Sequence, residues 1–507
     1  MSSIAVESDR PPSQNNILNS DSHEELLIEI FTFLTLNFAQ ELAVLSKRFK
    51  RVADDDSWKP NLLLYAWGSE TTSGRSREVV RPELLQLFYS PQKRRQVRQI
   101  TCTNCASFAL TYGGNLYWWG EMRADGESLC SPQPSILEPL RDHDIVRFDA
   151  TVPGYYHTNT LPLLQNSKIN VAVAFTDRDG DFFEWGMNLT GHMFVPITVD
   201  EDFTISGVQR EIRREFREEQ LPLLAERHSM LTPEFMQMQF EQFIAAHPMA
   251  RRAERMNYVA EPTKPEAFTE RKETVTLFSC GVTISAAVAV DPSGISRVYQ
   301  AADNKLTEIL ELRNIPIKQL VCGGWFCLAL DSTGDVWSWG DSLGPDTSNG
   351  SLLGRYVGGR STLHAARIEF PDKEKVKFIT ASTYNALAIS ESGTAYTWGD
   401  SDGYGLGHST KECHEPTQID AHLTAVDASL CYTSGSISSV EGSIYIWGGK
   451  AWAAVAGLVG GIKESVSSQT GFTEVSWAGT ALGYHNKQMK LGHRHGIIIA
   501  EKNQTKK

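Results

Sequence analysis

The sequence of 507 residues lacks an excess of basic side chains, since 48 Lys and Arg stand against 61 Asp and Glu, for a formal charge of −13. Nucleic acids and acidic membrane surfaces are bound through clustered basic residues, so this balance argues against both partners. No apolar run reaches the roughly 18 residues of a membrane-spanning helix. Residues 1–20 also lack the basic start and apolar centre of a signal peptide, and we expect them to form a disordered tail.

Cysteine is sparse and scattered, with eight residues in the whole chain. In a large chain without a secretion signal, this usage indicates reduced thiols and a cytoplasmic or nuclear protein. Cys102 and Cys105 form a CxxC, but no second Cys or His pair stands nearby at zinc-site spacing. Because Cys322 lies in a similar strand-like context, we interpret these residues as buried strand cysteines and expect neither metal nor cofactor.

Motifs of common catalytic sites are missing as well. The sequence contains no Gly-x-Ser-x-Gly, His-Glu-x-x-His or Gly-x-x-x-x-Gly-Lys. His408 follows a repeat motif, and His493 and His495 are best explained as turn residues before an apolar strand. We therefore expect no catalytic residue and a protein that acts by binding.

What the sequence does contain is a recurring Trp-Gly pair at the end of a short aromatic and apolar run, as in "DVWSWG" and "TAYTWG". Neighbouring clear copies are 52, 66, 59 and 49 residues apart, a period typical of a propeller or solenoid. The tryptophans expected to be repeated structural residues are Trp67, Trp119, Trp185, Trp339, Trp398 and Trp447.

Most of these runs follow a second apolar run and a glycine-containing turn, which together predict a β-hairpin. A degenerate unit, "AAVAVDPSGISRVYQ", has Gln300 near the place where Trp-Gly should fall. The glycines of "YTWGDSDGYGLGH" are interpreted as turn and close-packing residues of the repeat. A phosphate-binding loop is excluded because no Lys-Ser or Lys-Thr follows and the pattern recurs too often.

The two ends of the chain are complementary. The first unit, "NLLLYAWG", has the Trp-Gly strand without its partner run, and the last, "GHRHGIIIAEK", has the partner run alone. Together they complete one blade and close a ring, which removes exposed sheet edges. The fold class expected for residues 61–507 is mainly β, a seven-bladed β-propeller closed by its N- and C-terminal strands.

These repeats resemble those of the regulator of chromosome condensation family, most closely at "ALDSTGDVWSWG" and "AISESGTAYTWGDSDGYGLGH". The resemblance covers roughly residues 61 to 507 and implies a seven-bladed propeller. The family's usual Gly-Gln-Leu-Gly is never intact here, and most of its repeat histidines are absent. Because this fold carries many functions, the resemblance does not by itself assign an activity.

A small helical unit is expected before the propeller, at residues 21–60. Leu26, Leu27, Ile30, Phe31 and Leu34 fall on one face of a helix, which is followed by a second apolar stretch with a basic side. Forty residues of this kind would be marginally stable alone, so the unit requires a partner surface. The simplest alternative is a helical cap packed on the propeller.

This unit resembles an F-box, the motif that docks substrate receptors onto the Skp-type adaptor of cullin ubiquitin ligases. The match lies in "ELLIEIFTFL" and "LAVLSKRFKRVADDDSWK", although Ser22-His23 stand where the motif usually has Leu-Pro. The resemblance implies that the adaptor is faced by Leu26, Leu27, Ile30, Phe31 and Leu34. The residues that would complete this interface, or the motif's own core, are Leu36, Phe38, Val44, Leu45, Phe49 and Trp58.

A helical insertion interrupts the repeats at about residues 200–272, because Trp185 and Trp339 are 154 residues apart with only one degenerate blade between them. Its first part is highly charged, and its second carries flexible Met beside Phe, as adaptable binding surfaces do. Packing against the propeller is the more common role of such a helix, and target binding is the alternative. The residues of a possible target-binding face are Phe235, Met238, Phe240 and Phe243.

The chain therefore resembles the SCF-associated factor class of F-box proteins with chromosome-condensation-type repeats. This resemblance implies the substrate-recognition subunit of a Skp–cullin–F-box ubiquitin ligase, without catalysis of its own, that delivers target proteins for proteasomal degradation. The adaptor would bind the F-box, and the propeller or the insertion would bind the target. The alternatives are a propeller guanine-nucleotide exchange factor and a scaffold without a ligase role.

Overall fold

The computed structural model describes the chain between Leu62 and Asn503, leaving out 69–78, 152–170, 197–210, most of 225–257, 342–351, 449–472, 475–483 and several shorter stretches. The expected tail (1–20) and F-box segment (21–60) lie outside the described residues, and so does every residue named above for the adaptor interface.

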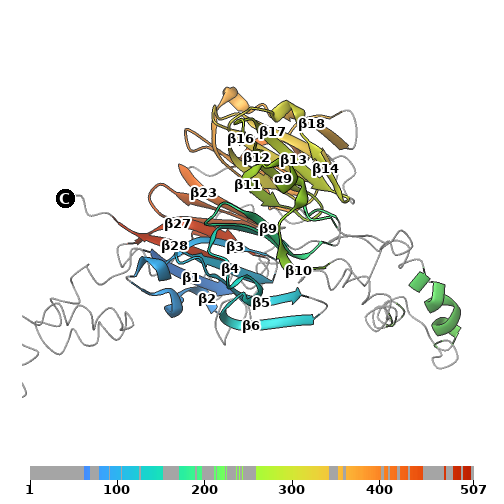
Figure 1. Cartoon of the computed structure of the whole chain (residues 1–507). Coiled ribbons are helices and arrows are strands. Elements are labelled where there is room, and N and C mark those ends of the chain that lie inside the picture. The colour runs from blue at the N-terminus through green and yellow to red at the C-terminus, as the bar shows by residue number, and fades with distance from the viewer. Residues whose placement is uncertain are drawn as a thin grey trace, which may run out of the picture.

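Seven four-stranded antiparallel sheets form the fold, a seven-bladed β-propeller (Figure 1). We number the blades along the chain, beginning with the blade that both chain ends share. Blade 1 contains β2 (Val79–Leu84), β1 (Leu62–Gly68), β28 (His495–Lys502) and β27 (Tyr484–Leu491). Blade 2 contains β3 (Val97–Cys102), β4 (Ala106–Thr111), β5 (Leu116–Ala124) and β6 (Glu127–Ile136). Blade 3 contains β7 (Ile145–Thr151), β8 (Ala172–Asp177), β9 (Phe182–Met187) and β10 (Tyr258–Thr263).

Blades 4 to 7 follow in chain order. Blades 4 and 5 contain β11 (Thr274–Cys280), β12 (Ser285–Val290), β13 (Ser296–Ala302) and β14 (Lys305–Glu308), then β15 (Ile317–Cys322), β16 (Phe326–Asp331), β17 (Val336–Asp341) and β18 (Ser361–Arg367). Blades 6 and 7 contain β19 (Val376–Ala381), β20 (Asn385–Ser390), β21 (Ala395–Asp400) and β22 (Glu412–Gln418), then β23 (Ala425–Cys431), β24 (Ser434–Ser439), β25 (Ile444–Gly448) and β26 (Thr473–Glu474).

The described helical segments are short and lie in the connections. Helix α9 (Glu266–Arg271) joins blades 3 and 4, and a π-helical turn, η8 (Phe216–Gln220), lies between β9 and β10. The 3-10 turns are η3 (Gln86–Phe88), η4 (Lys93–Arg95), η5 (Glu138–Leu140), η9 (Leu310–Leu312) and η10 (Pro371–Lys373).

Blade 1 closes the ring by joining the two ends of the described chain. Strand β1 pairs antiparallel with β28 along its full length, from Leu62 opposite Glu501 to Gly68 opposite His495. The N-terminal part of the chain thus supplies the two outer strands of this blade, and the C-terminal part supplies the two inner strands. The ring has no seam at which a sheet edge is left open between blades.

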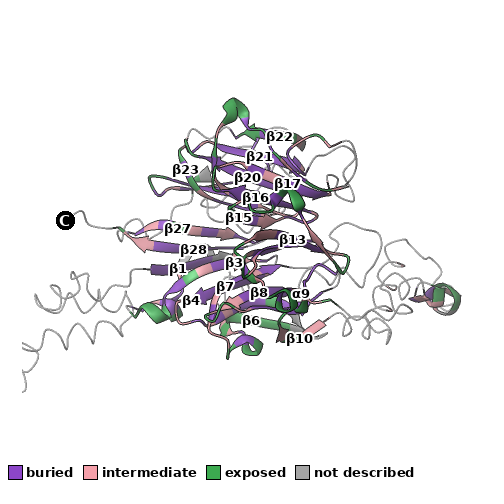
Figure 2. Cartoon of the chain, turned by 45° about the horizontal axis from the view of Figure 1, so that its top comes forward, coloured by how far each residue is buried: buried purple, intermediate pink, exposed green. Residues whose placement is uncertain are grey.

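The core lies between neighbouring blades, where large side chains of facing sheets interdigitate. The side chains of Trp119, Trp185, Trp339, Trp398 and Trp447 are almost fully buried there. Figure 2 shows this burial along the strands, with exposed residues concentrated at turns and outer edges. Burying indole rings of this size supplies a large share of the apolar stabilisation, so blades stabilise one another rather than folding alone.

The glycines after the Trp-Gly pair pack one blade against the next. Gly405 accepts a hydrogen bond from the indole Nε1 of Trp447 at 3.0 Å, and Gly407 lies against the same ring. Gly407 has a φ of +76°, and a Cβ there would come within 2.9 Å of Trp447 Nε1. A residue without a side chain is therefore required at this turn.

Blade 4 is the degenerate unit. Tyr299 lies opposite Ala287 as Trp339 lies opposite Cys327 in blade 5, so Tyr299-Gln300 occupies the Trp-Gly position. The Tyr299 hydroxyl donates to Glu273 at 2.8 Å, and Arg297 bridges Glu273 and Asp291. Charged groups at the outer side of this blade thus bind one another.

The insertion is shorter than the sequence predicts. Residues 258–263 were expected within it but form β10, which pairs with β9 as the outer strand of blade 3, and 266–271 form α9. The insertion therefore ends before Tyr258 rather than near residue 272. The described residues between 211 and 224 are helical. The error arose because "YVAEPTKPEAF" lacks the alternation of a typical strand, a weak signal for an edge strand with a bulge.

The propeller has two unlike faces. On one, which we call the tight-turn face, the second and third strands of the blades are joined by short turns such as 178–181, 332–335 and 391–394. On the other, which we call the long-loop face, the third strands end before the long connections to the fourth strands, as at Met187, Asp341 and Gly448. Leu62 begins β1 and Lys502 ends β28 on the tight-turn face. In Figures 1 and 2 the C-terminus accordingly leaves on the side opposite the helical residues of the insertion.

Candidate functional site

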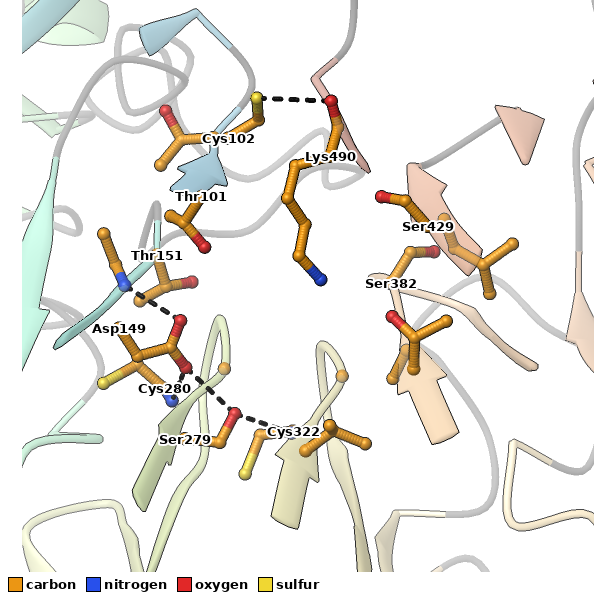
Figure 3. A pocket seen from close by; sticks show the side chains of 18 of the residues that line it. Thr101, Cys102, Asp149, Thr151, Ser279, Cys280, Cys322, Ser382, Ser429 and Lys490 are labelled. Carbon is orange, nitrogen blue, oxygen red and sulfur yellow. Dashed lines mark hydrogen bonds between the residues drawn. The ribbon is translucent and has the colours of Figure 1, made fainter. Parts of the chain in front are cut away.

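The first strands of the seven blades surround a cavity of about 290 Å³ on the ring axis (Figure 3). Its wall consists of the carboxyl-terminal halves of these strands and the turns that follow, namely residues 99–103, 147–151, 278–282, 319–323, 380–383, 429–431 and 488–492. Because those turns belong to the long-loop face, the cavity lies at that end of the channel.

Side-chain hydrogen bonds between adjacent blades hold the wall together. Gln319 of blade 5 donates to Ile379 O of blade 6 at 2.6 Å and accepts from Ile379 N at 3.0 Å. Gln99 of blade 2 makes the same pair of bonds with Phe148 of blade 3. An amide side chain can satisfy a backbone N–H and C=O at once, so these glutamines extend the pairing across the blade boundary. The channel wall is thereby preorganised.

Lys490 of β27 projects its side chain into the middle of this ring, as Figure 3 shows. Its backbone carbonyl accepts a hydrogen bond from the Cys102 thiol at 3.6 Å, which fixes the strand against blade 2. The structure gives the Lys490 ammonium no ion pair with any carboxylate of the described residues. A mobile stem with three N–H donors is therefore directed at the cavity.

Asp149 of β7 lies on the same wall, but its carboxylate oxygens already accept hydrogen bonds from the protein. Its Oδ2 accepts from the Ser279 hydroxyl at 3.0 Å and from Cys280 N at 2.9 Å, while Oδ1 accepts from Ala150 N at 3.0 Å. Burial raises the pKa of Asp149, against these hydrogen bonds and the charge of Lys490, which lower it. The carboxyl group thus acts as a clamp between blades 3 and 4.

Two further charges stand close to the cavity. Arg147 lines it and stacks on the Phe278 ring, with Cζ 5.4 Å from the ring centroid. Burial lowers the pKa of Arg147, but a guanidinium keeps its charge at neutral pH. Asp427, behind the wall, accepts from Met489 N at 2.9 Å, and burial raises its pKa although Lys490 opposes this. The lining itself has two cations and one hydrogen-bonded carboxyl group.

The cysteines of the channel wall lie at the ends of strands, as expected, but Cys102, Cys280 and Cys322 are half-buried rather than buried, because they line the cavity. Burial raises the pKa of Cys102 to about 12 and those of Cys280 and Cys322 well above their usual range. Such thiols are poor nucleophiles and poor metal ligands at neutral pH. Among the residues that the structure describes, no group of His, Cys, Asp and Glu side chains is placed to hold a metal ion.

Aromatic residues stand at the rim on the long-loop face. Trp325, in the turn between β15 and β16, stacks on Tyr384 of the next blade, with ring centroids 5.0 Å apart and planes inclined by 30°. Tyr356, in the connection between β17 and β18, is 88% exposed. Tryptophan and tyrosine are enriched at the centres of protein interfaces, so this rim is suited to contact another protein.

The residues expected from the sequence are not gathered at one site. The six tryptophans are distributed one to each blade except blade 4. The side chain of Trp67 lies outside the described residues, as do Phe235, Met238 and Phe240. Phe243 is half-buried and packs on Phe216 within the insertion, at 5.5 Å between centroids. Lys490 and Arg147 were missed, because only ring closure brings residues so distant in sequence to one axis.

Comparison with known proteins identifies the repeat. The family model described as "Regulator of chromosome condensation (RCC1) repeat" matches residues 317–343. The chain is 28% identical over 142 residues to RUG3, an RCC1 domain-containing mitochondrial protein of Arabidopsis thaliana, covering 26% of this chain and 29% of that protein. It is 29% identical over 151 residues to a mouse secretion-regulating guanine nucleotide exchange factor, covering 27% of the chain and 30% of that protein.

A third relative is the human E3 ubiquitin-protein ligase HERC2, 27% identical over 157 residues, which are 28% of this chain and 3% of that protein. The chain thus matches less than a third of the length of each of these relatives. Among solved structures, Prp20p from Saccharomyces cerevisiae is similar with a TM-score of 0.56 at 14% identity, covering 87% of this chain and 92% of that one. The chain is therefore a seven-bladed β-propeller with repeats of the regulator of chromosome condensation type.

Proposed function

We propose that this protein is the substrate-recognition subunit of a Skp–cullin–F-box ubiquitin ligase. The observation that carries the proposal is that the start of the propeller and its candidate binding features lie on opposite faces of the ring. The chain enters the ring at Leu62 on the tight-turn face, whereas the insertion, the aromatic rim and the cavity belong to the long-loop face. A segment that binds an adaptor just before Leu62 would leave the long-loop face free for a target.

In this role the chain contributes proximity rather than chemistry. The adaptor and the cullin bring the ubiquitin-charged enzyme, and the propeller brings the target, so that ubiquitin transfer becomes effectively intramolecular. The thiols of Cys102, Cys280 and Cys322, whose pKa values are raised, would not be nucleophiles in such a mechanism. No residue of the propeller needs to touch the reacting atoms.

The adaptor-binding part of the proposal depends on residues 21–60, and their resemblance to an F-box supports it. The name of HERC2 as an E3 ubiquitin-protein ligase adds support, since it places repeats of this type in another ubiquitin ligase. We place the protein in the cytoplasm or nucleus. In the part of the chain that the structure describes, no helix is both long and apolar enough to cross a membrane.

The second candidate is a guanine-nucleotide exchange factor. The secretion-regulating exchange factor is among the relatives, and the Prp20p structure is described with binding to Gsp1p and histones. This function leaves the F-box-like segment without a role. The net charge of −13 also gives the chain no excess of basic residues for binding DNA. Acceleration of nucleotide release from a Ran-type GTPase by the purified chain would favour it over the ligase.

The ligase function is tested by comparing three forms of the full chain in cells treated with a proteasome inhibitor. These are the wild type, the Phe31→Asp/Leu34→Asp variant and a deletion of residues 205–257. We expect ubiquitylated proteins to co-purify with the wild type but not with the double variant. Equal ubiquitylation with both would refute the proposal. The deletion then decides whether the insertion or the remaining long-loop face holds the target.

A further inference from the structure

We propose that the axial cavity binds an oxyanion, the carboxylate or phosphoryl group of a protein segment that lies across the long-loop face. This proposal rests on the function above only in taking that segment to belong to the ligase target. The group would be held by the Lys490 ammonium. Arg147 also lines the cavity and adds a positive charge to its wall, with its guanidinium stacked on Phe278. Recognition of the target would then depend on an acidic or phosphorylated residue.

The charge of the cavity is opposite to that of the molecule. The whole chain carries −13, whereas the lining has Lys490 and Arg147 against Asp149 alone. Inside a channel with low-dielectric walls, a cation without an ion-pair partner attracts an anion more strongly than it would at the surface. The net negative charge of the molecule disfavours anions overall, so a cation on the axis marks a local exception.

The acidic groups nearby do not neutralise Lys490 by contact. Asp149 is engaged by Ser279, Cys280 and Ala150, and Asp427 is engaged by Met489 N. Both carboxyl groups are tied to the backbones of neighbouring strands, and they influence Lys490 only through space. The ammonium therefore has its N–H donors available for a ligand oxygen.

The size and access of the cavity fit one side chain of an extended segment. A volume of 290 Å³ corresponds to roughly ten water molecules of about 30 Å³ each, enough for an oxyanion group with a few waters but not for a folded element. The hydroxyl groups of Thr101 and Ser429 on the wall can donate to the same anion (Figure 3). At the rim, Trp325 stacked on Tyr384 offers an aromatic surface for the adjoining residues.

The test is binding of two simple probes, inorganic phosphate and acetate, to the full chain by titration calorimetry. Four forms are compared: the wild type, Lys490→Met, Lys490→Arg and Lys487→Met. Lys487 is the matched control, because it lies on the same strand but pairs with Glu501 at the surface. Ligand-induced changes in melting temperature are recorded for each form, so that the variant's own stability is subtracted.

We expect Lys490→Met to weaken probe binding about tenfold or more, which is the loss of a charge-assisted hydrogen bond. Lys490→Arg should retain most of the binding, and Lys487→Met should equal the wild type. Preference for phosphate over acetate would assign the phosphoryl source, and the reverse would assign a carboxylate. Failure of both probes to bind, or equal binding by Lys490→Met, would overturn the proposal.

The outcome is separable from that of the ligase function. Adaptor binding is measured on the same Lys490→Met protein and is expected to be unchanged, because the substitution lies in the channel. If adaptor binding is present and probe binding is absent, only the oxyanion site is wrong. If the probes bind through Lys490 but no adaptor binds, the oxyanion site is supported and the proposed ligase function is refuted.

Discussion

Leu64 lies opposite Ile499 in the antiparallel pairing of β1 with β28, and both side chains are essentially fully buried. The pair joins the first described strand to the last, so every other blade boundary depends on it for a closed ring. Each blade is stabilised mainly by its neighbours, and opening one boundary exposes the apolar faces of two blades. The shared blade is accordingly the place where local damage should affect the whole domain.

Removing the closing strand tests this dependence. Deletion of residues 495–507 removes Ile497, Ile498 and Ile499, each buried, and should cost at least about 6 kcal/mol at about 2 kcal/mol for each isoleucine. We expect one cooperative thermal transition in the wild type and a large fall in melting temperature after the deletion, measured by circular dichroism. Deletion of 504–507 alone is the control. An unchanged melting temperature after the longer deletion would contradict ring closure as the source of stability.

The packing role of the repeat glycines is tested by two alanine substitutions. Gly407 and Gly294 both have positive φ, +76° and +85°, so both variants carry the same backbone strain. Only Gly407 has Trp447 Nε1 within 2.9 Å of the added Cβ, whereas nothing lies within 4 Å at Gly294. Gly407→Ala should therefore lose about 1–3 kcal/mol more in urea unfolding than Gly294→Ala. Equal losses would show that the turn has room for a side chain.

Much of the propeller could be predicted because each blade repeats the same local signals. The alternation around Trp339 and Trp398, and the turns between the paired runs, predict hairpins without knowledge of the neighbours. The outer strands were harder, because β10 and β26 are short or bulged and have no strong alternation. Hence the predicted insertion extended too far, over residues 258–272.

A buried acid predicts how stability depends on pH. Burial raises the pKa of Glu184 to about 8 from its ordinary 4.5, and its Oε2 accepts from Val195 N at 2.8 Å. The folded chain thus holds the proton more tightly than the unfolded chain. The contribution of Glu184 to the free energy of unfolding is complete below pH 4.5, and it is lost as the pH rises through its folded-state pKa of about 8.

Glu184→Gln removes this titration while keeping an amide oxygen as acceptor. The melting temperature of the variant relative to the wild type should therefore rise between pH 5 and pH 9, in scans at both values. A difference that is the same at both pH values would show that Glu184 is ionised throughout or that its environment is solvated.

Thiol reactivity distinguishes buried strand cysteines from a functional thiol. Burial raises the pKa of Cys102 to about 12 and holds that of Cys322 well above its usual range, while Cys130 is exposed. At pH 7 a maleimide should label Cys130 at least about tenfold faster than either channel cysteine, as followed by mass spectrometry of peptides. Labelling of Cys322 at the rate of Cys130 would contradict the raised pKa of the channel thiols.

The candidate site was much less predictable than the fold. Lys490 stands in "NKQMKLGH", where nothing separates it from the solvated Lys487 three residues earlier. Its significance comes from the bulge between Asn486 and Gln488 and from a ring that places β27 on the axis. Strand periodicity assigns a side chain to one face of a sheet. It does not identify which strand of each sheet is the innermost one and therefore lines the axis of the ring.

The central claim is that the segment before Leu62 couples this propeller to a Skp-type adaptor. Its most direct measurement is calorimetric titration of the purified adaptor into the full chain and into the Phe31→Asp/Leu34→Asp variant, with circular dichroism to verify that both propellers melt alike. We predict a one-to-one complex with the wild type and no measurable binding by the variant. Absence of binding by the wild type, or equal affinity of both forms, would contradict the account and leave a propeller scaffold.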